Sequence, residues 1–308
     1  MRIVVMGTGG TGGYFGAKLA RAGEEVTFVA RGAHLAAIRE HGLRVKSAIE
    51  GESVVRAPAV ERVDGLPAAD LVLFCVKSFD TERAAAAVRP VVGAGTGVLS
   101  IQNGVDNEDK LADILGPGHV IGGVAKVFST IEAPGLISHV LLGQLIFGEM
   151  DGKESERTRA FLAACGRAGI AAELSADMRR SLWEKYIFLV AQAGMTALTR
   201  LPAGLIRRVP ETRHMYRMLL DEMTRLGRAA GVRVEEAGAD TYMSMLDSLG
   251  EQAYSSLHHD LVHGKRLELE ALHGHAIRLG QRYAIPTPTL SAVYAALRPY
   301  RDGRPEHA

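Results

Sequence analysis

The 308-residue sequence has little of what marks secreted, membrane-spanning or nucleic-acid-binding proteins. Its two cysteines, Cys75 and Cys165, each lie in an apolar run, so we expect reduced, buried thiols and no disulfide. No uninterrupted apolar stretch reaches about 20 residues, so no membrane span is expected. The formal net charge of +1 gives no sign of a nucleic-acid partner or an acidic tail. The first strand begins at once and leaves no room for a signal peptide, so we expect a soluble, cytoplasmic protein.

Internal repeats, low-complexity segments and metal-ligand spacings are missing as well. His258, His259 and His263 come nearest to an exception, because their helical spacing would suit a metal pair. A zinc site needs further ligands, and neither a thiolate nor another obvious ligand lies nearby. We therefore expect surface or cleft histidines and no metal.

Glycine, in contrast, is plentiful, and the first glycines form a motif. Residues 3–6 are apolar, as in a strand buried on both faces, and a helical stretch and a second strand (residues 25–30) follow the motif. In such a unit one glycine turns the chain, the next lets the backbone approach a pyrophosphate, and the third lets helix and strand pack closely. The open amides at the helix start favour phosphate. The context predicts a dinucleotide site, the alternative being a glycine-rich turn that binds nothing. Its residues are Gly7, Thr8, Gly9, Gly10, Thr11 and Gly12.

The end of the second strand indicates which dinucleotide would bind. About 20 residues after the glycines, NAD-binding proteins place Asp or Glu on the ribose 2′-hydroxyl. Here Arg31 occupies that region, and the first acidic residue beyond it is Glu40. A cation pairs with a 2′-phosphate, whereas a carboxylate repels it. The sequence therefore favours NADP(H) over NAD(H), the alternative being an exposed loop arginine.

Polar residues also follow two further apolar strands. Lys77 ends the run from Asp70, and Asn103 follows the run from Gly97. In an open parallel sheet the ligand cleft lies beyond the carboxyl ends of the strands, so we expect both side chains at the cofactor crevice. For the Asn-Gly pair, a simple turn is the alternative.

The order of the elements predicts an α/β protein of two domains. Residues 43–46 and 53–57 suit a hairpin or short strands, and residues 119–124 suit a further strand. The short runs 126–131, 136–142 and 144–147 suit an antiparallel extension of the sheet, and residues 169–173 suit a closing edge strand. Beyond Ser175 the spacing becomes helical, with a cap at Ser175 and Asp177. We expect an N-terminal Rossmann-like dinucleotide-binding domain at 1–175 and an all-helical C-terminal domain at 176–308, which would bind substrate and form dimers.

Two residues of the helical part are candidates for chemistry. A nicotinamide-dependent reductase needs a donor at the carbonyl oxygen that becomes an alkoxide. Lys185 lies in an apolar helix beside the only tryptophan, Trp183, and either extends to solvent or sits in a cleft with a lowered pKa. Glu268, taken alone, is an ordinary helix carboxylate.

In order and spacing these pieces resemble the ketopantoate reductase family (NADPH-dependent 2-dehydropantoate 2-reductases of pantothenate biosynthesis) over nearly the whole chain. The resemblance implies that Lys185 is the general acid at the ketone oxygen and that Glu268 acts beside it in the catalytic site. It also implies that Glu268 and Ser256 hold the substrate and that Lys77 and Asn103 line the cofactor and substrate cleft. The matching residues are the glycine motif, Arg31, Val76-Lys77, Gln102-Asn103-Gly104, Trp183-Glu184-Lys185, Ser255-Ser256, Asp260 and Gly264 to Glu268.

The chain departs from the family pattern at the substrate. Leu189, Ala193 and apparently Ala253 stand where well-studied members carry substrate-binding asparagines, and we expect the first two on the helix face of Lys185. Gln192 is the one residue expected to restore a polar contact. The first expectation is reduction of ketopantoate to pantoate. The alternatives are a relative acting on a more apolar 2-oxo acid or carbonyl compound, and a non-catalytic NADP(H) sensor. The apolar helices would support a homodimer.

Overall fold

The structure, a computed structural model, describes residues 1–234 and 238–305, and the chain forms two compact units, Met1–Ser181 and Leu182–Ala308. The division falls within helix α6 (Met178–Thr199), a few residues beyond the boundary expected near 175. Asp177 caps this helix by accepting a hydrogen bond from the Arg180 amide at 3.1 Å. The sequence signal marks the start of the helix, whereas the two units separate about one turn later.

Unit 1 is built on a ten-stranded sheet with the order β4-β3-β9-β8-β7-β6-β1-β2-β5, and β10 pairs with β9. Strands β5, β2, β1, β6, β7 and the start of β8 run parallel, which is the arrangement of a doubly wound dinucleotide-binding sheet. The strands are β1 (Arg2–Met6), β2 (Glu25–Val29), β3 (Leu43–Ser47), β4 (Gly51–Val55), β5 (Ala59–Val60), β6 (Leu71–Phe74), β7 (Gly97–Ser100), β8 (Val120–Ala133), β9 (Leu136–Glu149) and β10 (Ala171–Leu174).

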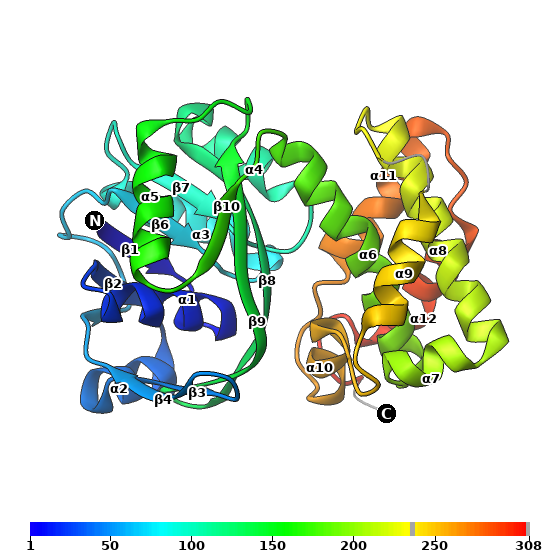
Figure 1. Ribbon diagram of the computed structural model, residues 1–308, viewed down its shortest axis with the longest axis horizontal. Coiled ribbons are helices and arrows are strands. Elements are labelled where there is room, and N and C mark those ends of the chain that lie inside the picture. The colour runs from blue at the N-terminus through cyan, green and yellow to red at the C-terminus, as the bar shows by residue number, and fades with distance from the viewer. Residues whose placement is uncertain (235–237, 306–308) are drawn as a thin grey trace. The chain divides into compact units, whose positions relative to one another are not determined.

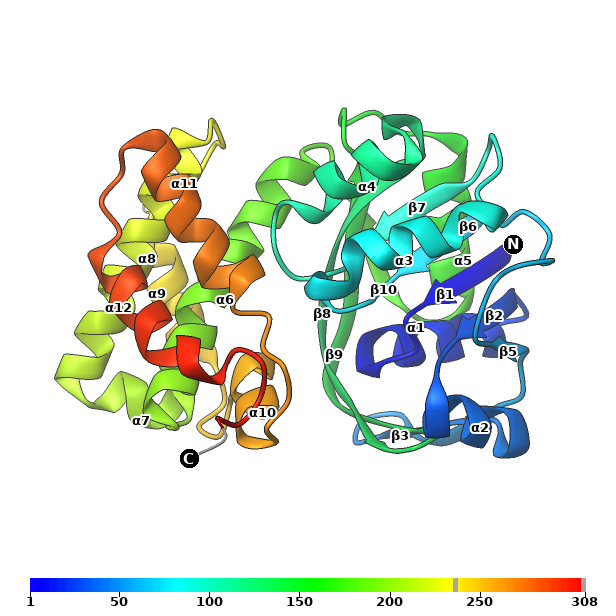
Figure 2. The ribbon, with the colours of Figure 1, turned by 180° about the vertical axis from the view of Figure 1, so that it is seen from behind.

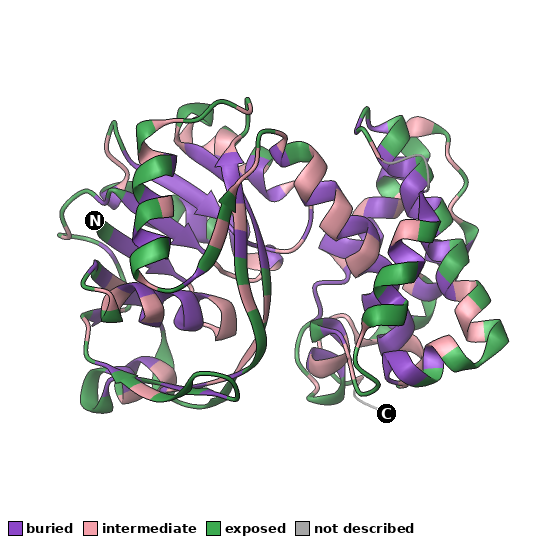
Figure 3. Cartoon of the chain, viewed as in Figure 1, coloured by how far each residue is buried: buried purple, intermediate pink, exposed green. Residues whose placement is uncertain are grey.

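Both faces of the parallel sheet are covered by helices, as the apolar strands predict. Ile3 and Val5 of β1 pack on one side, with α1 (Gly10–Arg21) and α5 (Glu156–Arg167) (Figure 1). Val4 and Met6 pack on the other side, with α3 (Thr81–Val88) and α4 (Asn107–Leu115) (Figure 2). The central strands are therefore buried along their length (Figure 3).

Two hairpins extend the sheet. The expected hairpin of β3 and β4 is confirmed, with Leu43 opposite Val55, and the closing strand β10 is confirmed beside β9. The short antiparallel strands expected after Val124 are instead one long pair, β8 and β9, interrupted by register shifts. Gly143 breaks the sequence pattern without ending the strand, because it is the extra residue of a bulge with φ = 137°.

Unit 2 is helical, as expected, and its core is organised by α8. Tyr216, Leu220 and Met223 of α8 are fully buried. Glu222 is buried beside them and its carboxylate accepts the amides of Thr289 and Leu290 at 2.8 and 2.9 Å. This carboxylate thus caps the first turn of α12 (Pro288–Leu297), 67 positions further along the chain. The helices after α6 are α7 (Ala203–Arg208), α8 (Pro210–Ala229), α9 (Ala239–Ser248), α10 (Ser256–Val262), a π-helical turn (Glu270–Gly274), α11 (His275–Tyr283) and α12 (Pro288–Leu297).

Both cysteines are free thiols, and burial raises the pKa of Cys165 to about 12. Among the residues that the structure describes, no helix is long and apolar enough to cross a membrane.

Candidate active site

The glycine motif forms a tight loop between β1 and α1. Gly7 has φ = 99°, and a Cβ there would lie 2.9 Å from the backbone nitrogen of Val76. A Cβ at Gly12 would lie 2.2 Å from the carbonyl oxygen of Gly7. A Cβ at Gly9, in contrast, would meet no protein atom within 4 Å. Gly7 and Gly12 are therefore needed to close the loop, while Gly9 leaves open space beside its backbone, as a bound pyrophosphate requires.

The other residues of the motif are placed mainly by packing. A Cβ at Gly10 would lie 2.1 Å from the Ser129 carbonyl oxygen, so glycine allows the start of α1 to pack on β8. The Thr8 side chain is buried, and its hydroxyl and its amide both donate to the Val29 carbonyl, at 3.0 and 3.1 Å. Thr11 is partly exposed in the first turn of α1. The Thr8 amide and hydroxyl are therefore already engaged by Val29, and of these residues Thr8 serves to anchor the loop to β2.

Arg31 lies at the carboxyl end of β2, immediately before α2 (Gly32–His41), and its side chain is 56% exposed. Its guanidinium is 3.7 Å from the Asp80 carboxylate. Asp80 pairs more closely with Arg83, at 2.6 Å. The structure thus brings Arg31 next to the short 3-10 turn Ser78–Asp80 that follows Lys77. A weak, exposed pair of this kind leaves the Arg31 guanidinium accessible to an incoming phosphate.

Lys77 and Asn103 follow neighbouring strands, β6 and β7, and their loops are tied together. The Gln102 side-chain amide donates to the Val76 carbonyl and to the Thr81 hydroxyl, both at 2.9 Å. The Asn107 side chain donates to the Asn103 carbonyl at 3.0 Å. Lys77 and Asn103 are both partly exposed at the carboxyl edge of the sheet, where the open-sheet rule places the ligand.

The start of α4 holds a buried carboxyl that the sequence pattern did not reveal. Glu108 is 3% exposed, and burial raises its pKa to about 7. Interactions with the Ser100 hydroxyl and the Glu108 amide lower the pKa and offset this effect of burial only in part. An acidic residue in the first turn of a short helix is normally solvated, so the sequence alone gave no reason to single it out.

In unit 2, the turn of α6 that carries Lys185 is joined to the segment that starts at Glu268. Lys185 is partly exposed, whereas its neighbour Tyr186 is buried and donates its hydroxyl to the Leu272 carbonyl at 2.5 Å. The Leu272 amide in turn donates to the Glu268 carbonyl at 3.1 Å. Glu268 itself is 6% exposed. The two residues expected to carry chemistry therefore lie on segments linked by one buried hydroxyl.

The same two segments also approach closely one turn of the π-helix later. His273 is fully buried, and burial lowers its pKa to about 4. A Cβ at Gly194 of α6 would lie 2.6 Å from the His273 ring, so glycine is needed where the ring enters. π-helical turns are frequent at functional sites, and this one begins two residues after Glu268.

Ser255 and Ser256 have different environments, the first buried and the second exposed. Ser255 is buried and caps α10, because its hydroxyl accepts the His258 amide at 3.1 Å. It also lies 2.7 Å from the Thr196 hydroxyl of α6. Ser256, the residue expected at the substrate, is exposed at the first position of α10. Ser256 is thus the member of the pair available to a small molecule.

The positions that replace the family asparagines have different surroundings. Leu189 is partly exposed, like Lys185, but Ala193 is completely buried inside unit 2. Gln192, expected to restore a polar contact, is 5% exposed and accepts the Tyr216 hydroxyl at 3.2 Å. Ala253, the third of the replaced positions, is partly exposed, as Leu189 is.

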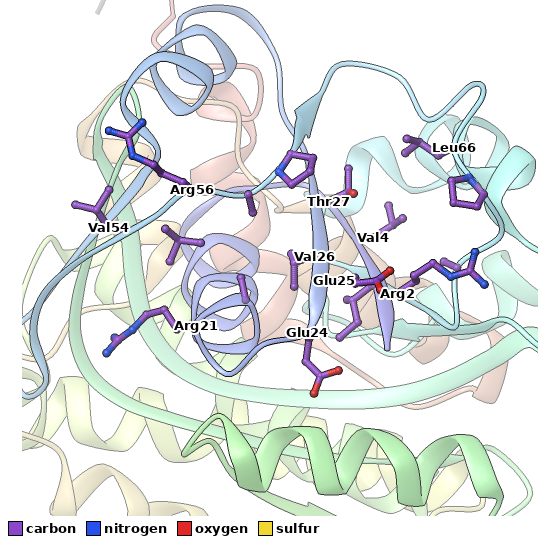
Figure 4. Close-up of a pocket in the computed structure, with 17 residues that line it drawn as sticks. Arg2, Val4, Arg21, Glu24, Glu25, Val26, Thr27, Val54, Arg56 and Leu66 are labelled. Carbon is purple, nitrogen blue, oxygen red and sulfur yellow. The ribbon is translucent and has the colours of Figure 1, made fainter.

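A cavity of about 530 Å³ lies at the other edge of the sheet (Figure 4). It is lined by the starts of β1 and β2, at Arg2 and Glu25. The Glu24 carboxylate is already neutralised by the N-terminal amine at 2.5 Å and Arg167 at 2.6 Å. Because open parallel sheets bind ligands at the carboxyl ends of their strands, this cavity is not the candidate active site.

The histidines of α10 do not gather into a metal site. The rings of His259 and His263 lie 4.1 Å apart, and the ring of His258 stacks on Tyr254 at 4.1 Å. Over residues 1–234 and 238–305, no group of three or more His, Cys, Asp or Glu is arranged to hold a metal ion.

Comparison with known proteins agrees with this arrangement over both units. The model of the ketopantoate reductase PanE/ApbA family matches residues 3–152, and that of the C-terminal part of the same family matches residues 177–301. The 2-dehydropantoate 2-reductase of Mesorhizobium japonicum is 33% identical over 320 residues, 97% of each chain. That of Halobacterium salinarum is 31% identical over 98% of this chain and 100% of its own. The crystal structure of a PanE/ApbA family ketopantoate reductase from Ralstonia eutropha superposes with a TM-score of 0.90, at 33% identity and 98% coverage of each chain. The chain therefore belongs to the ketopantoate reductase family, a family of oxidoreductases that act on a CH–OH/C=O group with a nicotinamide dinucleotide.

Proposed function

We propose that the protein reduces a small 2-oxo acid to the 2-hydroxy acid with NADPH. The observation that carries this proposal is the exposed guanidinium of Arg31 beside a glycine loop, at the position where NAD-binding proteins place a carboxylate. A 2′-phosphate would gain a charge-assisted hydrogen bond from Arg31 and displace its long contact with Asp80. The amides of the glycine loop and the dipole of α1 would hold the pyrophosphate.

When bound, the nicotinamide supplies a hydride to the carbonyl carbon. In our proposal the ammonium of Lys185 donates a proton to the carbonyl oxygen, so that the C=O bond becomes a CH–OH group. Glu268 and Ser256 orient the substrate together with Asn103, and Lys77 lines the cleft. Support for these roles comes from the links inside each unit: Tyr186 joins the segments of Lys185 and Glu268, and Gln102 joins the loops of Lys77 and Asn103.

Two substrates follow from different observations. The names of the relatives at 31–33% identity favour 2-dehydropantoate (ketopantoate). The side chain of Leu189, partly exposed one turn after Lys185, favours a 2-oxo acid with a more apolar tail. An apolar wall cannot pair with the hydroxyl of ketopantoate, and an unpaired buried hydroxyl costs about 1–3 kcal/mol. Ketopantoate remains the first choice, and slow turnover or a high KM is expected with it.

The deciding experiment compares kcat/KM for ketopantoate with that for its analogue lacking the hydroxyl, following NADPH oxidation by the purified protein. A preference for ketopantoate of about a hundredfold would identify it as the substrate. Preference for the analogue would identify the apolar alternative. If neither these nor other 2-oxo acids are reduced while NADPH still binds, the protein is a sensor of the dinucleotide and the catalytic proposal is wrong.

A further inference from the structure

One side chain outside the glycine motif holds the motif in place. His34 lies in the first turn of α2, three residues after Arg31, and is partly buried. Its Nε2 is 2.8 Å from the carbonyl oxygen of Thr8, inside the glycine loop. The backbone amide of Gly135, in the turn between β8 and β9, donates to its Nδ1 at 2.9 Å. The imidazole therefore connects the loop, the helix that follows Arg31, and the distant hairpin.

The partners fix the protonation of the ring. A backbone amide can only donate, so Nδ1 must be the unprotonated nitrogen. The proton is then on Nε2, which donates to the Thr8 carbonyl. Burial lowers the pKa of His34, which favours this neutral form.

Holding the Thr8 carbonyl determines where the next amide points. The chain has no cis peptide bonds among its described residues, so the C=O of Thr8 and the N–H of Gly9 point in opposite directions. With the carbonyl turned to His34, the Gly9 amide points away from His34. The Thr8 hydroxyl and the Thr8 amide, which belongs to the preceding peptide, both donate to Val29, so Thr8 is held on both sides of its Cα. Gly9 is also the residue of the motif with open space beside it.

We propose that His34 is a positioning residue for the dinucleotide: through the Thr8 carbonyl it aims the Gly9 amide at the pyrophosphate. This inference rests on the proposed cofactor function. The proposed role of His34 can be distinguished from that of Arg31, because NADPH and NADH both carry the pyrophosphate whereas only NADPH carries the 2′-phosphate. Loss of His34 should therefore weaken both dinucleotides by the same factor, whereas loss of Arg31 should weaken NADPH alone.

The test uses three substitutions that differ in which of the two hydrogen bonds of His34 the new side chain can still form. In His34→Gln the side-chain amide can still donate to the Thr8 carbonyl, as Nε2 does. In His34→Asn the shorter side chain can accept only from Gly135, as Nδ1 does, and His34→Ala does neither. The matched control is His41→Ala, since His41 is the last residue of the same helix and is exposed.

Dissociation constants for NADPH and NADH are measured by titration of each variant. We expect about tenfold weaker binding of both dinucleotides to the Ala and Asn variants, near-normal binding to the Gln variant, and no change in His41→Ala. The inference is overturned if Asn binds as well as the wild type, if Gln is as poor as Ala, or if the NADPH-to-NADH ratio changes. Equal losses in all three variants, with equal losses of thermal stability, would mean a purely structural role and also overturn it. A wild-type protein that binds neither dinucleotide would instead refute the proposed function.

Discussion

Replacing Glu108 by glutamine should stabilise the sheet-containing unit by an amount that depends on pH. The Glu108 carboxyl is buried at the start of α4, beside the Ser100 hydroxyl. Burial disfavours the charged form and raises the pKa from 4.5 to about 7. Glutamine has nearly the same shape as the protonated acid but cannot ionise, so it removes this penalty.

The size of the effect follows from the difference in pKa between the folded and unfolded chains. Below pH 4.5 both states hold the proton, and Glu108 does not destabilise the fold by ionising. As the pH rises to about 7 the unfolded state has lost its proton while the native state retains it, so stability falls. At about 1.4 kcal/mol per pKa unit, Glu108→Gln should gain about 3 kcal/mol at pH 8 and under about 1 kcal/mol at pH 5.

Urea unfolding of the wild type and the variant at the two pH values gives these free energies directly. Asp109→Asn is the matched control, because Asp109 is the next residue of the same helix turn and is exposed. It should be neutral or slightly destabilising at both pH values, since it loses a favourable charge at the helix start. A gain for Glu108→Gln that is equal at pH 5 and pH 8, or absent at both, would refute the reasoning.

Three further substitutions test the site and the helical unit. Arg31→Ala should weaken NADPH by about tenfold or more and leave NADH nearly unchanged, because it removes a charge-assisted contact to the 2′-phosphate; equal losses in titrations with both dinucleotides would contradict this. Lys185→Ala should lower kcat by about 10²–10⁴ with the NADPH dissociation constant unchanged, and normal turnover would show that Lys185 is not the acid. Glu222→Ala should lower the free energy of unfolding of unit 2 by about 1–3 kcal/mol, because the amides of Thr289 and Leu290 lose their buried acceptor. Unfolding of Glu211→Ala, an exposed change on the same helix, is the comparison, and equal effects of the two would contradict the capping role.

The local pattern of apolar residues was sufficient to predict the architecture. The apolar run before Gly7 and the helical spacing after Ser175 predicted an α/β unit followed by a helical one, because periodicity depends only on neighbouring residues. The long β8–β9 pair was missed for the same reason. A bulge at Gly143 and a strand end at a glycine look alike in sequence, and only the pairing partner distinguishes them.

Residues that act through partners far away in the sequence could not be predicted from the local sequence pattern. His34 binds the Thr8 carbonyl 26 positions away and the Gly135 amide 101 positions away. The residues next to His34 in the sequence predict neither contact. Glu108 is a similar case, since its sequence neighbours are polar and its burial comes from elements that pack on α4 from elsewhere in the chain.

On α6, helical spacing alone predicts which residues share the face of Lys185 but not which of them are exposed. A helix turns about 100° per residue, so i+4 lies about 40° from Lys185, but i+8 lies about 80° away. Positions i+7 and i+11, Gln192 and Thr196, return to within about 20° of Lys185. Both are buried, because the same face that is partly open at Lys185 is covered further along by Tyr216 of α8 and by Ser255, the N-cap of α10. The apolar replacements are therefore unequal. Leu189 is placed to change what a substrate meets, whereas Ala193 changes how the helices of unit 2 pack.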